Sequence, residues 1–353
     1  RIAPRSGIED LVAELDEETE RLTRLGVDDT YGAVRSVFSW SWQHLGADAA
    51  RAFALLGAHP GRSISLQTAA AVLGVTERLA RELLDQLVRA NLIAELERHR
   101  YTAHDLLRHY ATEKLAALPE TVQREAIDRL DDSYLRAVVR ATSAVHGVSF
   151  RGARGVVVPP PQERGDPREG REWLEDELAN VVSVVGSSGS DRWPTPGMLA
   201  RVLSDYLDER GLFGDAMRMH GHARSLAAQV GDTARHADAT DDLARVLRRL
   251  GKYAEAAELH EAALATYRQT KDRTGEATTL HRLGVLEWRR GRYQLASEYL
   301  RAAVDLFAQL GDGVGQGNAR FALGIALRRL GDYNGARATH EEAIAVLRRI
   351  GTS

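Results

Sequence analysis

The sequence predicts a mainly all-α protein with two parts, an α-solenoid of repeated helical hairpins in its C-terminal half and a smaller helical domain with one β-hairpin before it. Three observations support this prediction. One residue pattern returns every 40 residues after Gly197, two helices with helix-turn-helix spacing lie before it, and two short extended runs follow those helices. A fixed period of this size is typical of stacked units that cannot bury their apolar faces alone.

The repeated pattern consists of a glycine, an aromatic residue two positions later and an alanine three positions after that. Its four copies begin at Gly211, Gly251, Gly291 and Gly331. Glycine is expected to end the first helix of each hairpin, because a backbone without Cβ turns back at low cost. The aromatic ring is expected to fill the space between the two helices, and the small alanine lets them approach closely.

The period exceeds the roughly 34 residues of the commonest helical-hairpin repeat. We expect the additional residues to lie in the connections between hairpins. Three such connections are Gly231-Asp232, Lys271-Asp272 and Gly311-Asp312.

The N-terminal part has the element order of a winged helix. Two helices are predicted at Ser65–Leu73 and Thr76–Ala90, with a turn at Gly74-Val75 and Thr76 as the N-cap of the second helix. Extended runs at Leu92–Glu95 and His99–Thr102 form the hairpin.

The second of these helices is the element with which a winged helix would contact DNA. Its outer face carries charges of both signs: Glu77, Glu82, Asp85, Arg78, Arg81 and Arg89. Because no basic stripe is available to phosphates, we do not expect this chain to contact DNA directly. A free-standing repeat scaffold whose winged helix binds DNA stays open as the alternative.

Composition excludes several classes of protein. The chain has 353 residues, 44% of them hydrophobic, which is enough for two or three buried cores. A formal net charge of −3 disfavours a protein that coats nucleic acid. Cysteine is absent, which is compatible with the cytoplasm and excludes a thiol nucleophile. No apolar run approaches the roughly 20 residues of a membrane span, so we expect a soluble protein without a membrane partner.

Two groups of motifs resemble known families. The runs Phe53–Gly61, Leu83–Leu92 and Tyr101–Ala111 look like the winged-helix end of an NB-ARC module, which belongs to the signal-transducing ATPases with numerous domains (STAND). The C-terminal pattern resembles the tetratricopeptide repeat, and its signature positions are matched by Leu283, Gly284, Gly291, Tyr293, Ala296, Leu300 and Ala303. The combination is similar to the AfsR-like regulators of actinobacteria, in which repeats follow an ATPase core.

This resemblance implies a cytoplasmic regulator of transcription. In that family ADP and the winged helix hold a closed state, and a ligand on the repeats opens it. A Met-His-Asp motif opens the last helix of the family's winged helix, and its histidine reaches the β-phosphate of ADP. The matching residue here is His104, with Ala103 in place of the methionine, and Asp105 is expected to cap the helix. On the residues alone, a capping aspartate beside an ordinary surface histidine is the competing interpretation.

No Gly-x-x-x-x-Gly-Lys-Ser/Thr loop occurs in the sequence, so we assign no catalytic residue and do not expect an enzyme. ADP or ATP is expected only in a full-length protein whose ATPase core lies upstream of Arg1. The predicted domains are residues 1–30 as the tail of the helical domain of the NB-ARC module, 31–118 as the winged helix, 119–170 as a connecting helix and Pro/Gly-rich linker, and 171–353 as the solenoid.

In tetratricopeptide proteins the first helix of each hairpin lines the groove. The residues predicted to face it are Arg245, Arg248, Arg249, His281, Trp288, Arg289, Asn318, Phe321, Arg328 and Arg329. Guanidinium groups beside aromatic rings suit carboxylate ligands, so we expect an acidic protein, peptide or small-molecule inducer. The competing interpretation is that arginines near a helix C-terminus complement its dipole, which contributes about 0.3–1 kcal/mol.

Three histidines also recur at one repeat position: His220, His260 and His340. They belong to different hairpins and are too far apart to share a metal ion, so we predict packing residues and no metal site.

Overall fold

The computed structural model describes residues 39–146 and 165–351. The predicted segment 1–30 and most of the predicted linker lie outside the described residues. The described residues form two compact units: unit 1 contains those up to Ala137 together with Glu177–Val184, and unit 2 contains those between Val138 and Asp176 and from Val185 onward. The stretch Glu177–Val184, predicted as part of the solenoid, therefore belongs to unit 1.

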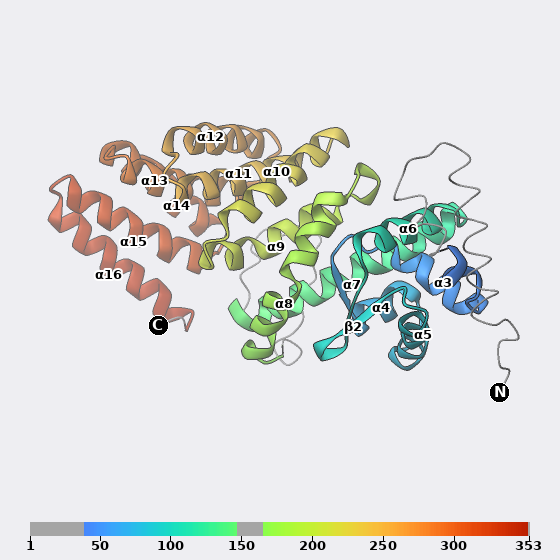
Figure 1. The fold of residues 1–353 in the computed structure, drawn as a ribbon. Coiled ribbons are helices and arrows are strands. Elements are labelled where there is room, and N and C mark those ends of the chain that lie inside the picture. Colours follow the sequence, from blue (N-terminus) through green and yellow to red (C-terminus); the bar gives the residue numbers. More distant parts are fainter. Residues whose placement is uncertain (1–38, 147–164, 352–353) are drawn as a thin grey trace, which may run out of the picture. The chain divides into compact units, whose positions relative to one another are not determined.

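Unit 1 has the predicted order of helices and strands, with one additional strand. Its elements are α3 (Ala47–Leu56), β1 (Ser63–Ser65), α4 (Leu66–Leu73), α5 (Glu77–Arg89), β2 (Ala94–Leu96), β3 (Arg100–Thr102) and α6 (Asp105–Ala116) (Figure 1). Strand β3 lies in the middle of a three-stranded antiparallel sheet, where Tyr101 is opposite Ile64 of β1 and Glu95 of β2. The sequence did not predict β1.

Local sequence signals explain the ends of α4 and α5. The Ser65 side chain accepts a hydrogen bond from the Thr68 amide at 3.1 Å, and Gly74 ends α4 in the left-handed conformation with φ 70°. Thr76 caps α5 by accepting a bond from the Leu79 amide at 3.4 Å. The two helices pack through fully buried residues such as Leu84.

Two longer helices follow, α7 (Glu120–His146) and α8 (Pro167–Ser187). Helix α8 begins inside the stretch predicted as linker, because Asp166 caps it through the Arg168 amide at 2.6 Å and proline suits the first turn. In unit 1 the Arg129 guanidinium of α7 donates to the Val72 carbonyl at the end of α4, at 2.9 and 3.1 Å.

The rest of unit 2 is a stack of four helical hairpins, preceded by the short 3-10 helix η3 (Ser190–Arg192). The helices are α9 (Thr195–Glu209), α10 (Phe213–Gln229), α11 (Thr233–Arg249), α12 (Tyr253–Gln269), α13 (Arg273–Arg289), α14 (Tyr293–Gln309), α15 (Gly313–Arg329) and α16 (Tyr333–Arg349) (Figure 1). We call α9, α11, α13 and α15 the first helices. Consecutive first helices contact one another.

The glycine turns are confirmed, since φ is 68° at Gly211, 78° at Gly251, 77° at Gly291 and 84° at Gly331. The alanines are confirmed as close-contact positions; Ala256, for example, is 0% exposed. The aromatic position is less uniform, because Tyr253 packs against the core whereas Tyr333 is 71% exposed.

The location of the additional residues in each repeat was predicted incorrectly. The helices from α10 to α16 each have 17 residues, and the connections between them are short turns such as Leu250–Lys252. The longer period therefore comes from longer helices. An aspartate such as Asp272 caps the next helix directly, with its side chain accepting from the Gly275 amide at 3.0 Å, which leaves no room for a longer loop.

Among the helices that the structure describes, none is long and apolar enough to cross a membrane. The chain is thus mainly helical, with a tetratricopeptide-like solenoid and one small sheet.

Candidate functional site

His104 lies at the N-terminus of α6 and is exposed to solvent. Its Nδ1 accepts the amide proton of Leu106 at 3.3 Å, so the histidine itself is the N-cap. The prediction that Asp105 caps this helix was wrong, because Asp105 is already the first helical residue and pairs with Arg108 at 2.9 Å. With Nδ1 as an acceptor, the neutral ring carries its proton on Nε2, where it can donate to another group.

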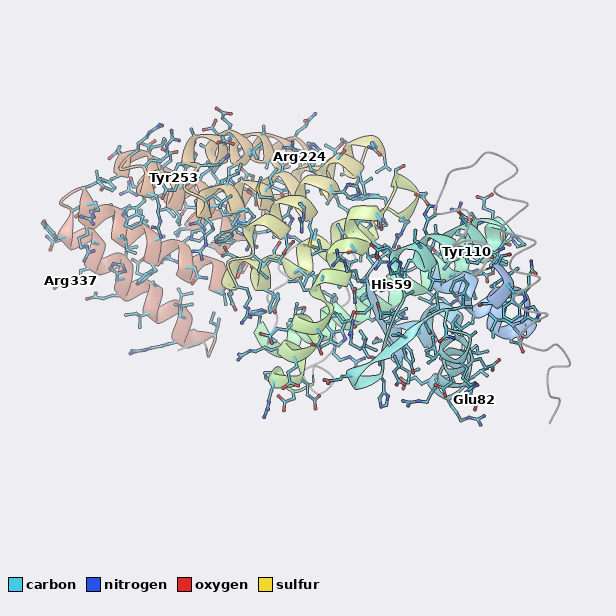
Figure 2. All side chains as sticks on the ribbon, in the orientation of Figure 1. His59, Glu82, Tyr110, Arg224, Tyr253 and Arg337 are labelled. Atoms are coloured by element: carbon cyan, nitrogen blue, oxygen red, sulfur yellow. The ribbon has the colours of Figure 1, made fainter. Side chains whose placement is uncertain are left out.

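The outer face of α5 shows no continuous basic surface. Glu82 projects from α5 (Figure 2) and lies 3.7 Å from the Arg78 guanidinium. Arg81 contacts the Nδ1 atom of His99 at 3.3 Å. These contacts agree with the expectation from the sequence that charges of both signs alternate on this helix.

Two of the predicted groove arginines are neutralised by aspartates of the preceding first helix. The Arg245 guanidinium lies 2.6 Å from Asp205, and its side chain is 14% exposed. Arg249 lies 2.8 Å from Asp208 and is 42% exposed. Both carboxylates come from α9, so these arginines hold α11 against the first hairpin.

Arg248 is half-buried near Asp208, but among the described residues it forms no ion pair with a carboxylate. Burial lowers the pKa of its guanidinium, and the positive charges of Arg249, Arg289 and Arg282 lower it further, while Asp208 acts in the opposite direction. His281 lies nearby, and burial together with Arg282 and Arg248 lowers its pKa to about 4. His281 is therefore a neutral ring at pH 7.

The remaining predicted groove residues lie on α13 and α15. Arg289 is exposed and stacks 5.5 Å from the centre of the Trp288 ring, whose buried Nε1 has no hydrogen-bond partner among the described residues. Phe321 is 57% exposed and its ring lies 5.2 Å from that of His340. Three further predicted residues are exposed on α15: Asn318, Arg328 and Arg329.

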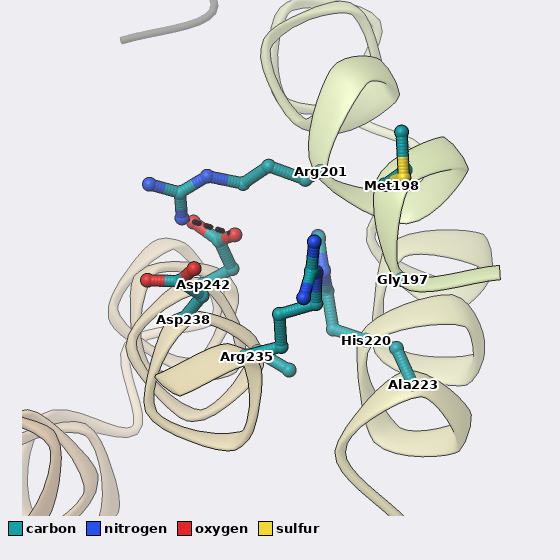
Figure 3. Close-up of a pocket in the computed structure, with 9 residues that line it drawn as sticks. Gly197, Met198, Arg201, His220, Ala223, Arg235, Asp238 and Asp242 are labelled. Atoms are coloured by element: carbon teal, nitrogen blue, oxygen red, sulfur yellow. Dashed lines mark hydrogen bonds and ion pairs between the residues drawn. The ribbon is translucent and has the colours of Figure 1, made fainter. Parts of the chain in front are cut away.

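A buried ionic cluster between the first helices was not predicted from the sequence. Arg201 extends from α9 to Asp242 on α11 (Figure 3), and Arg282 on α13 pairs with Asp241 and, at 3.4 Å, with Asp242. His260 contacts Asp241 at 2.6 Å. Burial alone would raise the pKa of Asp241, but Arg282 and His260 outweigh it and hold the pKa at about 2.

The spacing of these charges was a signal available in the sequence. Their partners are 40 or 41 residues apart, which is one repeat: Arg201–Asp242, Asp205–Arg245, Asp208–Arg249, Asp241–Arg282 and Asp242–Arg282. Opposite charges one period apart meet on neighbouring first helices.

The hollow beside this cluster is too small for a ligand. It is lined by Arg201, His220, Arg235, Asp238 and Asp242 (Figure 3), and its volume is about 20 Å³. That volume holds about one water molecule. His220 contacts Ser204 at 3.1 Å, and burial lowers its pKa to about 4, so it is a packed neutral residue.

Two models of the tetratricopeptide repeat match this chain, at residues 236–270 and 275–349. The chain is 34% identical over 193 residues to the "Regulatory protein AfsR" of Streptomyces coelicolor, a match that covers 50% of this chain and 18% of that protein. It is 39% identical over 129 residues to the protein of the same name from Streptomyces griseus, covering 35% of this chain and 13% of the relative. These matches therefore span less than a fifth of the relatives' length.

Among solved structures, BtubC (BKLC) from P. vanneervenii has 17% sequence identity and a TM-score of 0.43, over 70% of this chain and 86% of that one. A likeness of this size carries no argument about function. The chain thus contains tetratricopeptide repeats, and about half of it is similar in sequence to regulatory proteins.

Proposed function

We propose that this chain is the regulatory and ligand-sensing region of a STAND-type ATPase that controls transcription. In this proposal unit 1 is the winged helix that helps to hold an ADP-bound closed state, and the repeats bind an inducer or partner protein. The observation that carries the proposal is the 34% identity over 193 residues to a regulatory protein. Repeats of this kind offer extended surfaces for partners, and on α13 the exposed guanidinium of Arg289 lies 5.5 Å from the centre of the Trp288 ring.

ADP fits the residues at the start of α6. The exposed imidazole of His104 directs a donor at Nε2 away from its own helix, since Nδ1 accepts from the Leu106 amide. A helix N-terminus also favours an anion, because its free amide groups carry partial positive charge. When bound, ADP would supply a diphosphate charge at this helix end. Because the sequence has no P-loop, we assign the rest of the phosphate cradle to an ATPase core in the full-length protein.

The alternative, a free-standing scaffold that binds DNA through α5, has less support. On that helix Arg78 lies 3.7 Å from the Glu82 carboxylate, and Arg81 contacts His99 at 3.3 Å. Sequence-specific binding of this chain to duplex DNA at physiological salt would favour the alternative over our proposal.

The role of His104 is tested in the full-length protein with the variant His104→Ser. Serine is an efficient N-cap, so α6 stays capped while the imidazole donor is lost. A charge-assisted hydrogen bond contributes about 1.5–3 kcal/mol, so ADP affinity should fall by roughly 10- to 100-fold. We expect the variant to activate a reporter gene without inducer.

The matched control is His109→Ala, which removes an exposed histidine from the same helix away from its N-terminus. It should retain the wild-type need for inducer. Should His104→Ser also retain that need, with unchanged ADP affinity, the role assigned to His104 is wrong.

A further inference from the structure

Ion pairs between consecutive first helices follow the repeat period. Each pair joins residues 40 or 41 positions apart, as in Asp205–Arg245 and Arg201–Asp242. The carboxylates come from α9 and α11, and the guanidinium groups that meet them come from α9, α11 and α13. A side chain that forms such a pair therefore faces a side chain about one repeat earlier or later, on the neighbouring first helix.

The same spacing brings arginines together further along the solenoid. The residues 41 and 40 positions before Arg289 are Arg248 and Arg249, and the residue 40 positions after it is Arg329. Arg249 is neutralised by Asp208 at 2.8 Å. Within residues 39–146 and 165–351, no carboxylate forms an ion pair with Arg248, Arg289 or Arg329. In the earlier repeats this spacing pairs a carboxylate with a guanidinium group. From α11 to α15 the same spacing relates one arginine to another: Arg248 and Arg249 to Arg289, and Arg289 to Arg329.

Arg248 lies near more positive than negative charges: Asp208 stabilises its charge but already pairs with Arg249, whereas Arg249, Arg289 and Arg282 act against it. Its side chain is half-buried, and burial and the neighbouring arginines together lower its pKa, so the charge is only partly solvated. His281 beside it is neutral and supplies no opposing charge. The buried Nε1 of Trp288 is a further donor without a partner among the described residues. Repulsion between close like charges is relieved by an anion.

We propose that Arg248 and Arg289 form a carboxylate-binding site on the first-helix face, with Arg289 held beside the Trp288 ring. A carboxylate of the ligand takes the place that Asp205, Asp208, Asp241 and Asp242 occupy in the earlier repeats. This inference rests on the proposed function, in which the repeats bind the inducer. It removes Arg245 and Arg249 from the residues predicted to bind the ligand, because each already forms an ion pair with an aspartate of α9.

The ligand class follows from the chemistry that the fold already uses. In the earlier repeats the position is filled by a planar carboxylate, whose two oxygens match the fork of a guanidinium group. Exposed Phe321 adds apolar area on the next first helix. An acidic peptide and a small organic dicarboxylate share this chemistry, and the experiment separates them.

The site is tested on the 353-residue chain by fluorescence anisotropy with a labelled peptide of four consecutive glutamates. We expect the wild type to bind it, with affinity that decreases as salt increases. Arg289→Gln should weaken binding about tenfold, as loss of one charge-assisted bond does. Arg289 is exposed, so this variant should unfold at the wild-type urea concentration. Arg248→Gln should have an effect at least as large.

Arg249→Gln is the matched control, because it removes the same charge from an arginine that Asp208 already neutralises. It should change affinity by less than about threefold. Equal weakening by Arg249→Gln and Arg289→Gln, or no weakening by Arg289→Gln, would overturn the site. Glutarate alone, added as competitor, should displace the peptide if a small dicarboxylate is sufficient, and peptide binding that resists glutarate assigns the site to acidic peptides.

The inducer response of the full-length protein distinguishes this inference from the proposed function. If Arg289→Gln abolishes the response but neither the peptide nor glutarate binds, the repeats sense an inducer and the carboxylate assignment is wrong. If Arg289→Gln weakens peptide binding but the full-length variant still responds to the inducer, the carboxylate site is supported. The proposal that the inducer binds to the repeats at this site is then wrong.

Discussion

Units 1 and 2 each bury a group of charged side chains, but they neutralise it in different ways. In unit 1 a single carboxylate, Glu177, is 1% exposed and pairs with Arg100. Its other partners are neutral: the Tyr134 hydroxyl at 3.1 Å and the Asn180 amide at 2.8 Å. His59 in turn contacts the Tyr134 hydroxyl at 2.8 Å.

Unit 2 buries two adjacent carboxylates and pairs each with an arginine of a different helix. Asp241 and Asp242 lie on α11, Arg201 comes from α9 and Arg282 from α13. Because units of a solenoid contact only their neighbours, such pairs stabilise the interfaces between repeats. The cluster of unit 1 instead fixes the stretch Glu177–Val184 of α8 within that unit. We therefore expect loss of a carboxylate from the solenoid cluster to destabilise the protein more than loss of Glu177 from the cluster of unit 1.

The largest effect is expected from Asp242→Asn. The substitution leaves Arg201, which is 16% exposed, without its carboxylate, and breaking a buried pair in this way costs about 3–5 kcal/mol. The free energy of unfolding is measured by urea titration followed by circular dichroism. Asp208→Asn is the control, because its partner Arg249 is 42% exposed and the expected change is about 0–1 kcal/mol. Equal destabilisation by both variants would show that burial of the cluster does not matter.

Per residue, acidification gives the next largest effect. Burial lowers the pKa of His59 in unit 1, and of His220 and His281 in unit 2, to about 4. Between pH 6.5 and 4 the unfolded chain binds protons at these residues and the folded chain does not, so stability decreases as pH falls through this range. Each histidine contributes up to roughly 3 kcal/mol by pH 4.

His281→Gln should reduce by up to one the number of protons that the protein takes up on unfolding in this pH range. The difference between the free energies of unfolding at pH 7 and pH 4.5 should therefore be smaller in the variant than in the wild type. An unchanged difference would mean that His281 titrates normally in the folded protein.

A smaller effect is expected from Glu177→Gln in unit 1. Glutamine keeps an oxygen that accepts from Tyr134 or Asn180 but loses the charge that pairs with Arg100. Arg100 still donates to the Ser63 hydroxyl at 2.9 Å, whereas Asp242 pairs with two arginines, so we expect a smaller destabilisation of about 2 kcal/mol. Glu175→Gln on the same helix is the control, since Glu175 and its partner Arg210 are both about half-exposed and little change is expected. If Glu177→Gln destabilised the protein as much as Asp242→Asn, the proposed difference between the two clusters would be wrong.

The sequence alone determined the features that depend on near neighbours. The four glycine turns, the cap at Thr76 and the hairpin units were predictable, because each depends on residues a few positions apart. The choice of His104 over Asp105 as the cap of α6 was missed, because aspartate is a preferred N-cap residue and histidine is not, and the backbone path before the helix decided between them.

Only the tertiary structure decided which arginines are available to a ligand. Arg248 and Arg249 are adjacent and identical in type, yet Arg249 pairs with Asp208 whereas Arg248 has no ion pair among the described residues. The period of 40 residues was visible in the sequence, but the offset at which neighbouring first helices pack determines whether a side chain meets the residue 40 or 41 positions away. That offset depends on side-chain packing between helices, which no local pattern encodes.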